Sequence, residues 1–299
     1  MKKFIKICLI AGGICVLIGG GIAFTAAALG GDLLDVVPQR AVQWRKEIPG
    51  ITLDGFWEDL DDYYGREYTD IAEEGQEIYS SSEVKKLDVA ARAGSVVFVE
   101  DPAGDRIRVF CNRDETHWSR FEENEKLELQ VYPGRKGSGD DSGLLFTIHV
   151  PKDYHFSSVS LKLAHSNGSS DQEEPAPVLM AQSLSADEMN LETKAGTIKI
   201  SQGNAGDLNI VSDVGAVDFS GTTSGNIDAV CRVGAIRMEL AGKKEDYNYD
   251  IQCRLGAVKI GEESSAALKS KDTMDNGAGK NMDLECETGA IQVDFMNEL

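Results

Sequence analysis

The sequence is organised by VGAIRM at residues 233–238 and by four close copies of this phrase. Each copy has a small or apolar residue, glycine, a small residue, a β-branched residue, any residue and an apolar residue. The other close copies are AGTIKI at 195–200, VGAVDF at 214–219, LGAVKI at 255–260 and TGAIQV at 288–293. Two weaker copies are AGDLNI at 205–210 and SGNIDA at 224–229, and AGSVVF at 93–98 is a first, earlier copy. Such recurrence predicts a repeat architecture.

The spacing of the phrase glycines predicts an all-β fold, a β-solenoid. Successive separations are 10, 9, 10, 9, 22 and 33 residues for Gly196, Gly206, Gly215, Gly225, Gly234, Gly256 and Gly289. A full period of 19 residues with a half-period about half as long indicates two short strands per coil. We expect a stack, coil after coil, of Gly196, Gly215, Gly234, Gly256 and Gly289, with Gly206 and Gly225 opposite and Gly94 as an earlier copy. The two long gaps predict projecting insertions at residues 242–248 and 262–281.

Three cysteines share one phase of this repeat. Cys231, Cys253 and Cys286 lie three residues before phrase glycines, where earlier coils have Thr193 and Ser212. One interpretation is a redox pair or a soft-metal site. The other is a row of small core residues, because buried free cysteine is common in protein cores. A disulfide between Cys231 and Cys253 is sterically conceivable if the domain is exported to an oxidising space.

Period-2 alternation places charged residues on the outer surface of the coils. One outer row follows the stacked glycines by three residues and contains Lys199, Asp218, Arg237, Lys259 and Gln292. A second precedes them by two residues and contains Lys194, Asp213, Arg232, Arg254 and Glu287. Both rows begin basic, acidic, basic, which predicts cross-strand ion pairs. Because these residues recur at repeat positions, they indicate a structural ladder and not an active site.

The N-terminal segment, residues 1–31, predicts a transmembrane anchor. Residues 7–29 contain 23 consecutive uncharged positions, enough to cross a hydrocarbon core of ~30 Å. Lys2, Lys3 and Lys6 precede this run, and Asp32 and Asp35 follow it. The positive-inside rule therefore predicts a single-pass protein of a bacterial cell membrane, with a cytoplasmic N-terminus and an extracytoplasmic remainder. A cleavable signal peptide is the alternative, although the apolar run is long for one.

Two further segments follow the anchor. Residues 32–82 predict an acidic, flexible stalk, because residues 54–77 contain ten acidic residues against Arg66 alone and show no sustained periodicity. Its aromatic residues could instead dock on the folded domain or lie at the membrane surface. Residues 83–299 predict the β-strand-repeat domain, with N-terminal strands or a cap at 87–165 and regular repeats at 178–299.

Composition excludes several classes of function. The chain has 299 residues with 30 basic and 50 acidic side chains, a net charge of −20. Such acidity argues against nucleic acid as a partner and favours cationic partners. The four histidines show no metal-binding spacing, and there is no nucleophile elbow, phosphate loop or catalytic triad. We therefore predict no enzyme activity, no catalytic residue, no bound metal and no cofactor.

The anchor, the acidic stalk and the repeated phrase together resemble the bacterial β-strand-repeat family described as adhesin-like, a domain of unknown function. The likeness covers residues 87–295 and includes the VPK step at 150–152 before the repeats. The resemblance implies surface exposure and a role in adhesion or envelope sensing. It brings no catalytic residues, and the two insertions depart from a regular array.

These observations predict a non-enzymatic, membrane-anchored module that binds an envelope, wall or protein ligand. One alternative is a self-assembling, bactofilin-like scaffold and hence a homo-oligomer, because a final coil with no cap would leave an open strand edge. The other alternative is a polysaccharide-active β-helix enzyme.

Overall fold

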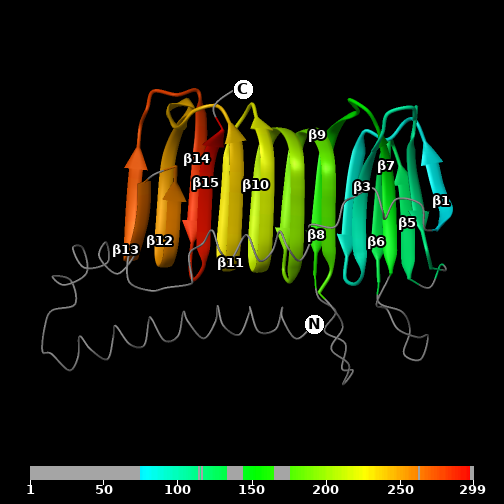
Figure 1. Cartoon of the computed structure of the whole chain (residues 1–299), viewed down its shortest axis with the longest axis horizontal. Helices are drawn as coiled ribbons and strands as arrows, with labels where there is room; N and C mark the ends of the chain where they lie inside the picture. Colours follow the sequence, from blue (N-terminus) through cyan, green and yellow to red (C-terminus); the bar gives the residue numbers. More distant parts are fainter. Residues whose placement is uncertain are drawn as a thin grey trace, which may run out of the picture. The chain divides into compact units, whose positions relative to one another are not determined.

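The computed structural model describes residues 75–113, 115, 117–132, 144–164, 176–261 and 263–296, with the side chains of 255–257 and 263–270 excepted. This part of the chain is all-β apart from one 3₁₀ turn, and its strands join in one sheet (Figure 1). In chain order the elements are β1 (Gln76–Ser81), β2 (Lys86–Ala91), β3 (Ser95–Asp101), β4 (Ile107–Cys111), β5 (Trp118–Glu123), β6 (Lys126–Val131), β7 (Leu145–Pro151), β8 (His155–Leu163), β9 (Val178–Thr193), β10 (Gly196–Thr223), β11 (Ile227–Ala241), η2 (Lys244–Asp246), β12 (Tyr247–Ile260), β13 (Glu263–Met274), β14 (Lys280–Cys286) and β15 (Ala290–Met296).

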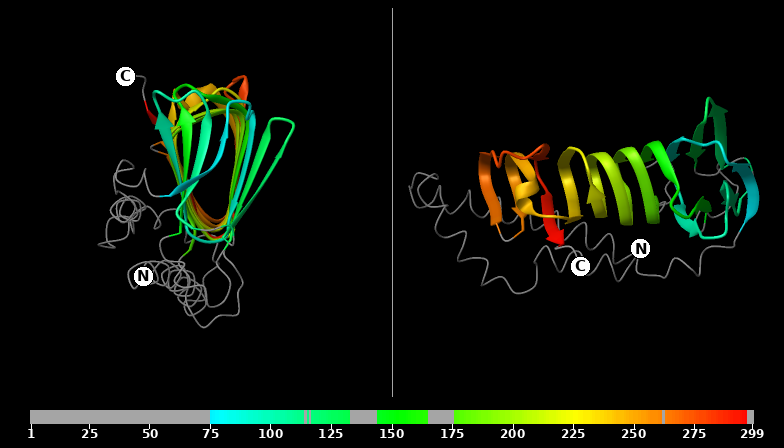
Figure 2. Two further views of the ribbon diagram at one scale, coloured as in Figure 1. Left: turned by 90° about the vertical axis from the view of Figure 1, so that its right-hand side faces the viewer. Right: turned by 90° about the horizontal axis from the view of Figure 1, so that it is seen from above.

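The predicted coil of 19 residues is confirmed. β10 pairs in parallel with β9, with Thr197 opposite Val178, and with β11, with Gly215 opposite Gly234. Each pairing shifts the chain by one repeat. Seen along the stack, the strands wrap around a flattened core (Figure 2).

The prediction of two short strands per coil is wrong for the regular repeats. β9 has 16 residues and β10 has 28, so pairing continues around the corners where we expected breaks. The reason is the exact repeat length, which keeps corner residues in register with the neighbouring coil, as Val214 is with Val233. A corner whose backbone still pairs does not end the strand.

The coil thus has two sheet faces. Face A consists of the segments that follow the stacked glycines: β3, β7, β15 and residues 178–183, 197–203, 216–221, 235–241 and 257–260. Face B consists of the opposite segments: β2, β6, β8, β14 and residues 186–193, 207–212, 227–231 and 247–253. Inward residues of both faces form one buried core, as shown by the fully buried row Ile198, Val217, Ile236 and Ile291.

The predicted order of the last coils is wrong. β14 and β15, which come last in the chain, lie between β11 and β12 and pair in parallel with both (Figure 1). The cause is the segment predicted as the second insertion. It forms β13, which runs back antiparallel along β12, so that Ile260 faces Glu263 and Tyr249 faces Met274. β13 pairs with the edge of β12 at the end of the stack, and β14 and β15 pair with the opposite edge of β12.

The first predicted insertion, residues 242–248, is integrated into the stack only at its end, because residues 242–246 form a turn without a buried residue. η2 makes a short turn, and Tyr247 then begins β12 with its ring fully buried. The Lys280 ammonium lies 4.2 Å from the centre of that ring. An aromatic side chain of this size contributes core area that a projecting loop would leave in water.

The strands before the regular repeats form the first coils of the same stack and not a separate cap. β2 pairs in parallel with β6 and β8, and β3 pairs in parallel with β7 and β9. The sheet begins at Gln76, inside the predicted stalk of residues 32–82, because β1 pairs antiparallel with β4. The rest of that stalk and the predicted anchor at 7–29 lie outside the described residues. Within the described ranges, no helix has the length and apolar character needed to cross a membrane.

Candidate functional site

The stacked glycines are positions of close backbone approach. A Cβ at Gly215 or Gly234 would overlap the carbonyl oxygen of the stacked glycine before it, Gly196 or Gly215. At Gly289 the obstacle is the Gly234 carbonyl oxygen, 2.5 Å away. Gly256 follows Gly289, since Ala257 pairs with Ala290. The stack therefore reads 196, 215, 234, 289, 256.

The other phrase glycines are equally confined. Gly94 has a φ of +74° and faces Leu144, and a Cβ at Gly206 would overlap the Asp187 carbonyl oxygen. A Cβ at Gly225 would overlap an Asp207 carboxylate oxygen. Seven of the eight predicted glycines are thus confined by neighbouring atoms, and the eighth, Gly256, has a place in the stack through the pairing of Ala257.

The cysteine row lies inside the core. Cys286 pairs with Cys231 on one side and Cys253 on the other, and all three are buried free thiols. Because Cys286 lies between them, a direct Cys231–Cys253 disulfide does not fit this order. A hydrogen bond with Cys231, reinforced by burial, raises the pKa of the Cys286 thiol. All three thiols are closed off from solvent, whereas reactive cysteines are partly exposed, and this favours the core interpretation of the row.

The predicted ion-pair ladder is confirmed at its centre. On face A the Arg237 guanidinium donates two hydrogen bonds to Asp218, with Nε 2.9 Å from Oδ1, and Lys199 Nζ lies 3.9 Å from the same carboxylate. In the second row Arg232 pairs with Asp213. Beyond Arg237, however, the revised coil order places Gln292 before Lys259. Gln292 donates to Asp294 at 2.6 Å, and Lys259 Nζ lies 3.7 Å from the same carboxylate. The charged side chains of face A are thus neutralised within the sheet, as in a structural ladder.

Face B carries a row of stacked polar residues that the sequence analysis missed. It runs in register across β9, β10, β11, β14 and β12 as Asn190, Asn209, Asp228, Asp283 and Asp250, and we call it the Asx row. At the asparagine end of the row, the Asn209 side-chain amide donates a hydrogen bond to Asn190 Oδ1 at 2.9 Å. The three aspartates stand on adjacent strands, about 4.8 Å apart.

The aspartate end of the Asx row is electrostatically unfavourable. Burial, then the negative charges of Asp283 and Glu285, raises the pKa of the Asp228 carboxyl. Lys271 lies 3.7 Å from one oxygen of Asp250, whose other oxygen is buried without a hydrogen bond to the described residues. Like charges directly opposite each other destabilise a sheet. Face B therefore concentrates negative charge that the fold does not need.

A second network missed by the sequence analysis connects neighbouring coils at one corner. His155 Nδ1 lies 2.7 Å from Ser185 Oγ, and its Nε2 lies 2.8 Å from Asp187 Oδ1. Asn204 donates to Ser185 at 3.1 Å. The linkage has the residue types of a hydrolytic triad, but 73% of the Asp187 side chain is exposed, and catalysis of that kind needs a water-excluding site with an oxyanion hole. The network is explained by cross-strand hydrogen bonding.

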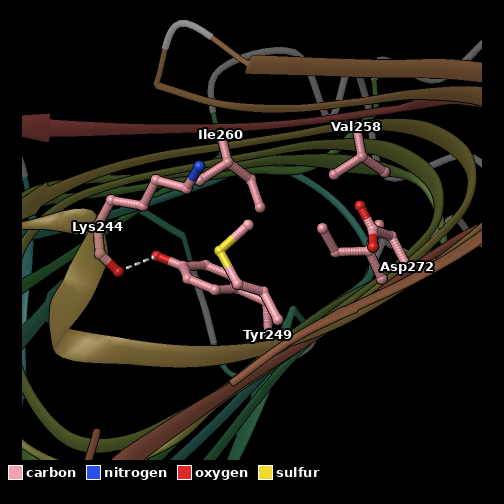
Figure 3. Close-up of a pocket in the computed structure, with 7 residues that line it drawn as sticks. Lys244, Tyr249, Val258, Ile260 and Asp272 are labelled. Atoms are coloured by element: carbon pink, nitrogen blue, oxygen red, sulfur yellow. Dashed lines mark hydrogen bonds between the residues drawn. The ribbon is translucent and has the colours of Figure 1, made fainter. Parts of the chain in front are cut away.

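A small pocket lies at the β12–β13 end of the stack (Figure 3). Its walls are mostly apolar and are formed by Tyr249, Ile251, Val258, Ile260 and Met274, with Lys244 and Asp272 at the edge. The Tyr249 hydroxyl donates to the Lys244 carbonyl oxygen at 2.6 Å. The pocket is the end of the apolar core beneath β13. Among the residues described, no group of three or more His, Cys, Asp or Glu side chains is arranged to hold a metal ion.

The repeat geometry has a counterpart among known families. Residues 178–294 match the Toastrack DUF4097 family model. The Toastrack match starts at the first residue of β9, includes β14 and ends within β15. It confirms the predicted resemblance to a β-strand-repeat domain of unknown function for this part of the chain.

Three solved structures are similar to this chain over 73–75% of its length. A "putative adhesin" from Bacteroides fragilis NCTC 9343 has 13% identity and a TM-score of 0.40, covering 74% of this chain and 97% of that one. A "putative cell adhesion protein" from Clostridium sporogenes ATCC 15579 has 10% identity and a TM-score of 0.32, covering 75% and 100%. A "putative adhesin" from Parabacteroides distasonis ATCC 8503 has 11% identity and a TM-score of 0.29, covering 73% and 97%. No curated protein matches the chain.

Proposed function

We propose that the protein is a non-enzymatic binding module on the bacterial surface, anchored by residues 7–29, that accepts cationic groups of an envelope component or peptide on the Asx row. The observation that carries the proposal is the stack of Asp228, Asp283 and Asp250 on adjacent strands. A row of carboxylates is costly to the free protein and becomes favourable when a cationic ligand neutralises it.

The character of the surrounding surface supports this choice. On face A the charges at the centre of the ladder are neutralised by each other, as the Arg237–Asp218 pair shows. The Asx row has fewer such pairs, with Lys271 the cation beside Asp250. A ligand with several positive groups spaced along a chain would match carboxylates spaced by about 4.8 Å.

Replacing the central carboxylate, Asp283→Asn, is expected to weaken binding and to stabilise the fold. Binding of poly-L-lysine at low ionic strength should weaken by about two- to fivefold, because one charge is lost. The free energy of unfolding at pH 7 should rise by about 0.2–1 kcal/mol, because a like-charge contact is removed. Fluorescence titration and urea unfolding measure the two effects.

The stability gain should depend on pH in a defined direction. The pKa of Asp228 is raised in the folded protein, so this group's contribution to stability falls as pH rises from its ordinary value, ~3.9, through the raised one. The gap between the variant and the wild type should be largest at neutral pH and shrink on acidification. Asp153→Asn is the control, because it removes one charge at a distant turn with a φ of +57°, a conformation that Asn tolerates. Equal weakening in both variants would refute the assignment of the Asx row.

The proposed location is tested by protease treatment of intact cells. An exported domain should be digested from outside, whereas a cytoplasmic marker protein stays intact. If the repeat domain survives until the cells are permeabilised, the exported topology is wrong.

The scaffold alternative has lost its main argument. The coil that ends the sequence is not an open edge, because β15 pairs with β11 on one side and β12 on the other. The stack ends instead at β13, whose Asp272 faces Ile251 in the register and whose segment also contains Lys269 and Lys271. Charged residues in an edge strand discourage further pairing.

A further inference from the structure

Two valines lie exposed side by side at the corner that precedes the stacked glycines. Val214 has 55% of its surface exposed and Val233 has 53%, and the two residues pair on adjacent coils. The flanking coils have Ala195 and Thr288 at the same corner position, so the corner itself does not require a large apolar residue. Isolated exposed apolar residues are ordinary, but two that adjoin form a continuous strip. Covering this strip is favourable, because it removes apolar surface from water.

Beside the valines, one residue earlier in each coil, lies a row of charges that alternates in sign. The backbone N–H of Glu287 donates to the Cys231 carbonyl oxygen, so Glu287 stands beside Arg232. In chain order Arg254 would stand there, and two like charges would adjoin. The observed order alternates basic, acidic, basic, acidic along Lys194, Asp213, Arg232 and Glu287. We call these four residues, with Val214 and Val233, the corner ridge, which runs along the stack of superimposed coils (Figure 2).

The charges of the corner ridge remain accessible to a second molecule. Arg232 pairs with Asp213, but 49% and 31% of these side chains are exposed. Lys194 Nζ lies 3.9 Å from Glu192 Oε1, and 62% of the Lys194 side chain is exposed. A guanidinium has five N–H donors and a carboxylate accepts several hydrogen bonds, so both ends of the Arg232–Asp213 pair keep capacity for further partners.

We propose that the corner ridge binds the corner ridge of a second copy of the chain, in antiparallel orientation. A two-fold axis that passes between the coils of Asp213 and Arg232 reverses the order of the row. Lys194 then faces Glu287 of the second copy, and Asp213 faces Arg232 of the second copy. All four charges of each ridge thus meet an opposite charge.

The valines and the charges select the same arrangement. The two-fold axis that brings the opposite charges together also places Val214 against Val233 of the second copy, twice. A parallel arrangement would place like charges opposite each other, which disfavours it. Charge complementarity of this kind determines orientation more than affinity, and the valines provide the apolar centre.

The extent of the corner ridge indicates a weak, closed dimer. Four coils extend over three strand spacings, about 14 Å, which corresponds to a small and transient interface. We expect a dissociation constant of about 10–100 μM. The two-fold axis uses the ridge of each copy completely, so the contact closes at two copies and does not continue into a filament.

Dimerisation would double the ligand surface of the module. Equivalent rows face each other across the axis, so face B of both copies is directed to the same side of the dimer. A long cationic ligand would then meet two Asx rows, which raises avidity. The dimer goes beyond the proposed function, and it holds or fails independently of what the Asx row binds.

Lys194→Cys combined with Glu287→Cys in the full-length protein, in detergent, tests the orientation. Cys8 and Cys15 are replaced by alanine in this background, and the four cysteines of the sheet are buried. Oxidation by oxygen with copper phenanthroline should produce at least about fivefold more disulfide-linked dimer in the double variant than in either single variant. The reason is that positions 194 and 287 face each other across the axis. Two copies of one position lie about 14 Å apart, beyond the ~7 Å that a disulfide allows.

The crosslinking result has clear contrary outcomes. Dimers that form in the single variants as readily as in the double variant would exclude the antiparallel arrangement. Absence of dimer in all three variants would exclude the interface. When the oxidation is repeated in intact cells, crosslinks only to a different protein would refute a second copy as the occupant.

A charge exchange separates the interface from effects on the fold. Asp213→Lys and Arg232→Glu should each weaken self-association about tenfold or more, because like charges then face each other across the axis. An equimolar mixture of the two variants should associate as strongly as the wild type, because every facing pair again has opposite charges. Damage to the fold of either chain would not be repaired by mixing. Sedimentation equilibrium in density-matched detergent measures the association, and a mixture no stronger than its components would overturn the proposal.

The valines are tested with a matched control. Val214→Ser combined with Val233→Ser should weaken dimerisation about tenfold. Phe121→Ser on β5 is the control, because Phe121 is equally exposed, at 57%, and lies outside the corner ridge. Equal weakening by Phe121→Ser, or a wild-type protein that stays monomeric up to about 1 mM, would contradict the dimer.

Discussion

Gly215→Ala is expected to destabilise the domain by at least about 3 kcal/mol. Gly215 has a φ of +150°, which L-residues rarely adopt, and a Cβ there would overlap the Gly196 carbonyl oxygen and lie 3.0 Å from Thr193 Oγ1. The obstacle is backbone of the adjacent coil, which cannot move without breaking its own pairing. An alanine at this position would therefore have both a strained backbone conformation and a steric clash of its Cβ, and a small shift of the backbone would not remove both.

Urea unfolding followed by circular dichroism measures this effect. Two glycines provide graded controls, because a Cβ on either meets no atom within 4 Å. Gly277 has a φ of +66°, so Gly277→Ala should cost about 1 kcal/mol through backbone strain alone. Gly279→Ala should be neutral or slightly stabilising. A stability loss in Gly215→Ala no greater than in Gly277→Ala would show that the coils are not in the register described.

Removal of residues 280–299 is expected to disrupt the domain far beyond the deleted segment. The deletion takes out β14 and β15, which connect β11 to β12. It also removes fully buried side chains, among them Met282, Cys286 and Ile291. Each large apolar side chain contributes about 2–3 kcal/mol to folding. β12 and β13 would have no neighbour on their inner side, and we expect them to unfold.

Limited proteolysis distinguishes this outcome from simple loss of a terminal coil. Residues 247–274 should become sensitive to protease in the truncated protein, whereas β8, β9 and β10 should stay protected. A stop codon directly after Met296 is the control and should leave the pattern unchanged. If residues 247–274 remain protected after the larger deletion, β12 has paired directly with β11, and the predicted dependence of β12 and β13 on the last coil is wrong.

The sequence analysis predicted the coil length and register because these depend on local, repeated signals. Glycine at 196, 215 and 234 with apolar residues two and four positions later determines which side chains face inward, and the pairing of Gly215 with Gly234 confirms it. The Arg237–Asp218 pair followed from the same register. The inward position of Cys231 followed as well.

The order of the last coils could not be predicted in this way. The sequence pattern does not distinguish Gly256 from Gly289 as the neighbour of Gly234, because both copies of the phrase have the same small and apolar residues. The choice depends on residues 263–274, whose serines and charges are typical of a loop. They form a strand because they can pair along the whole length of β12. Such tertiary pairing is not included in the β-propensity of the segment's own residues. The Asx row was missed for the same reason, since Asp283 joins Asp228 and Asp250 only through the revised order.

The interior position of β14 and β15 also has a kinetic consequence. A repeat array whose coils stack in chain order can grow as it is made, each new coil covering the previous one. In this protein one edge of β11 stays unpaired until β14 and β15 have been made. Until then, β12 and β13 also lack the strands that join them to the rest of the sheet. Formation of the complete stack is therefore a late, non-local event, which slows folding and leaves strand edges open in the meantime. Co-translational or co-secretory assembly would end in a single closing step that depends on the last coil.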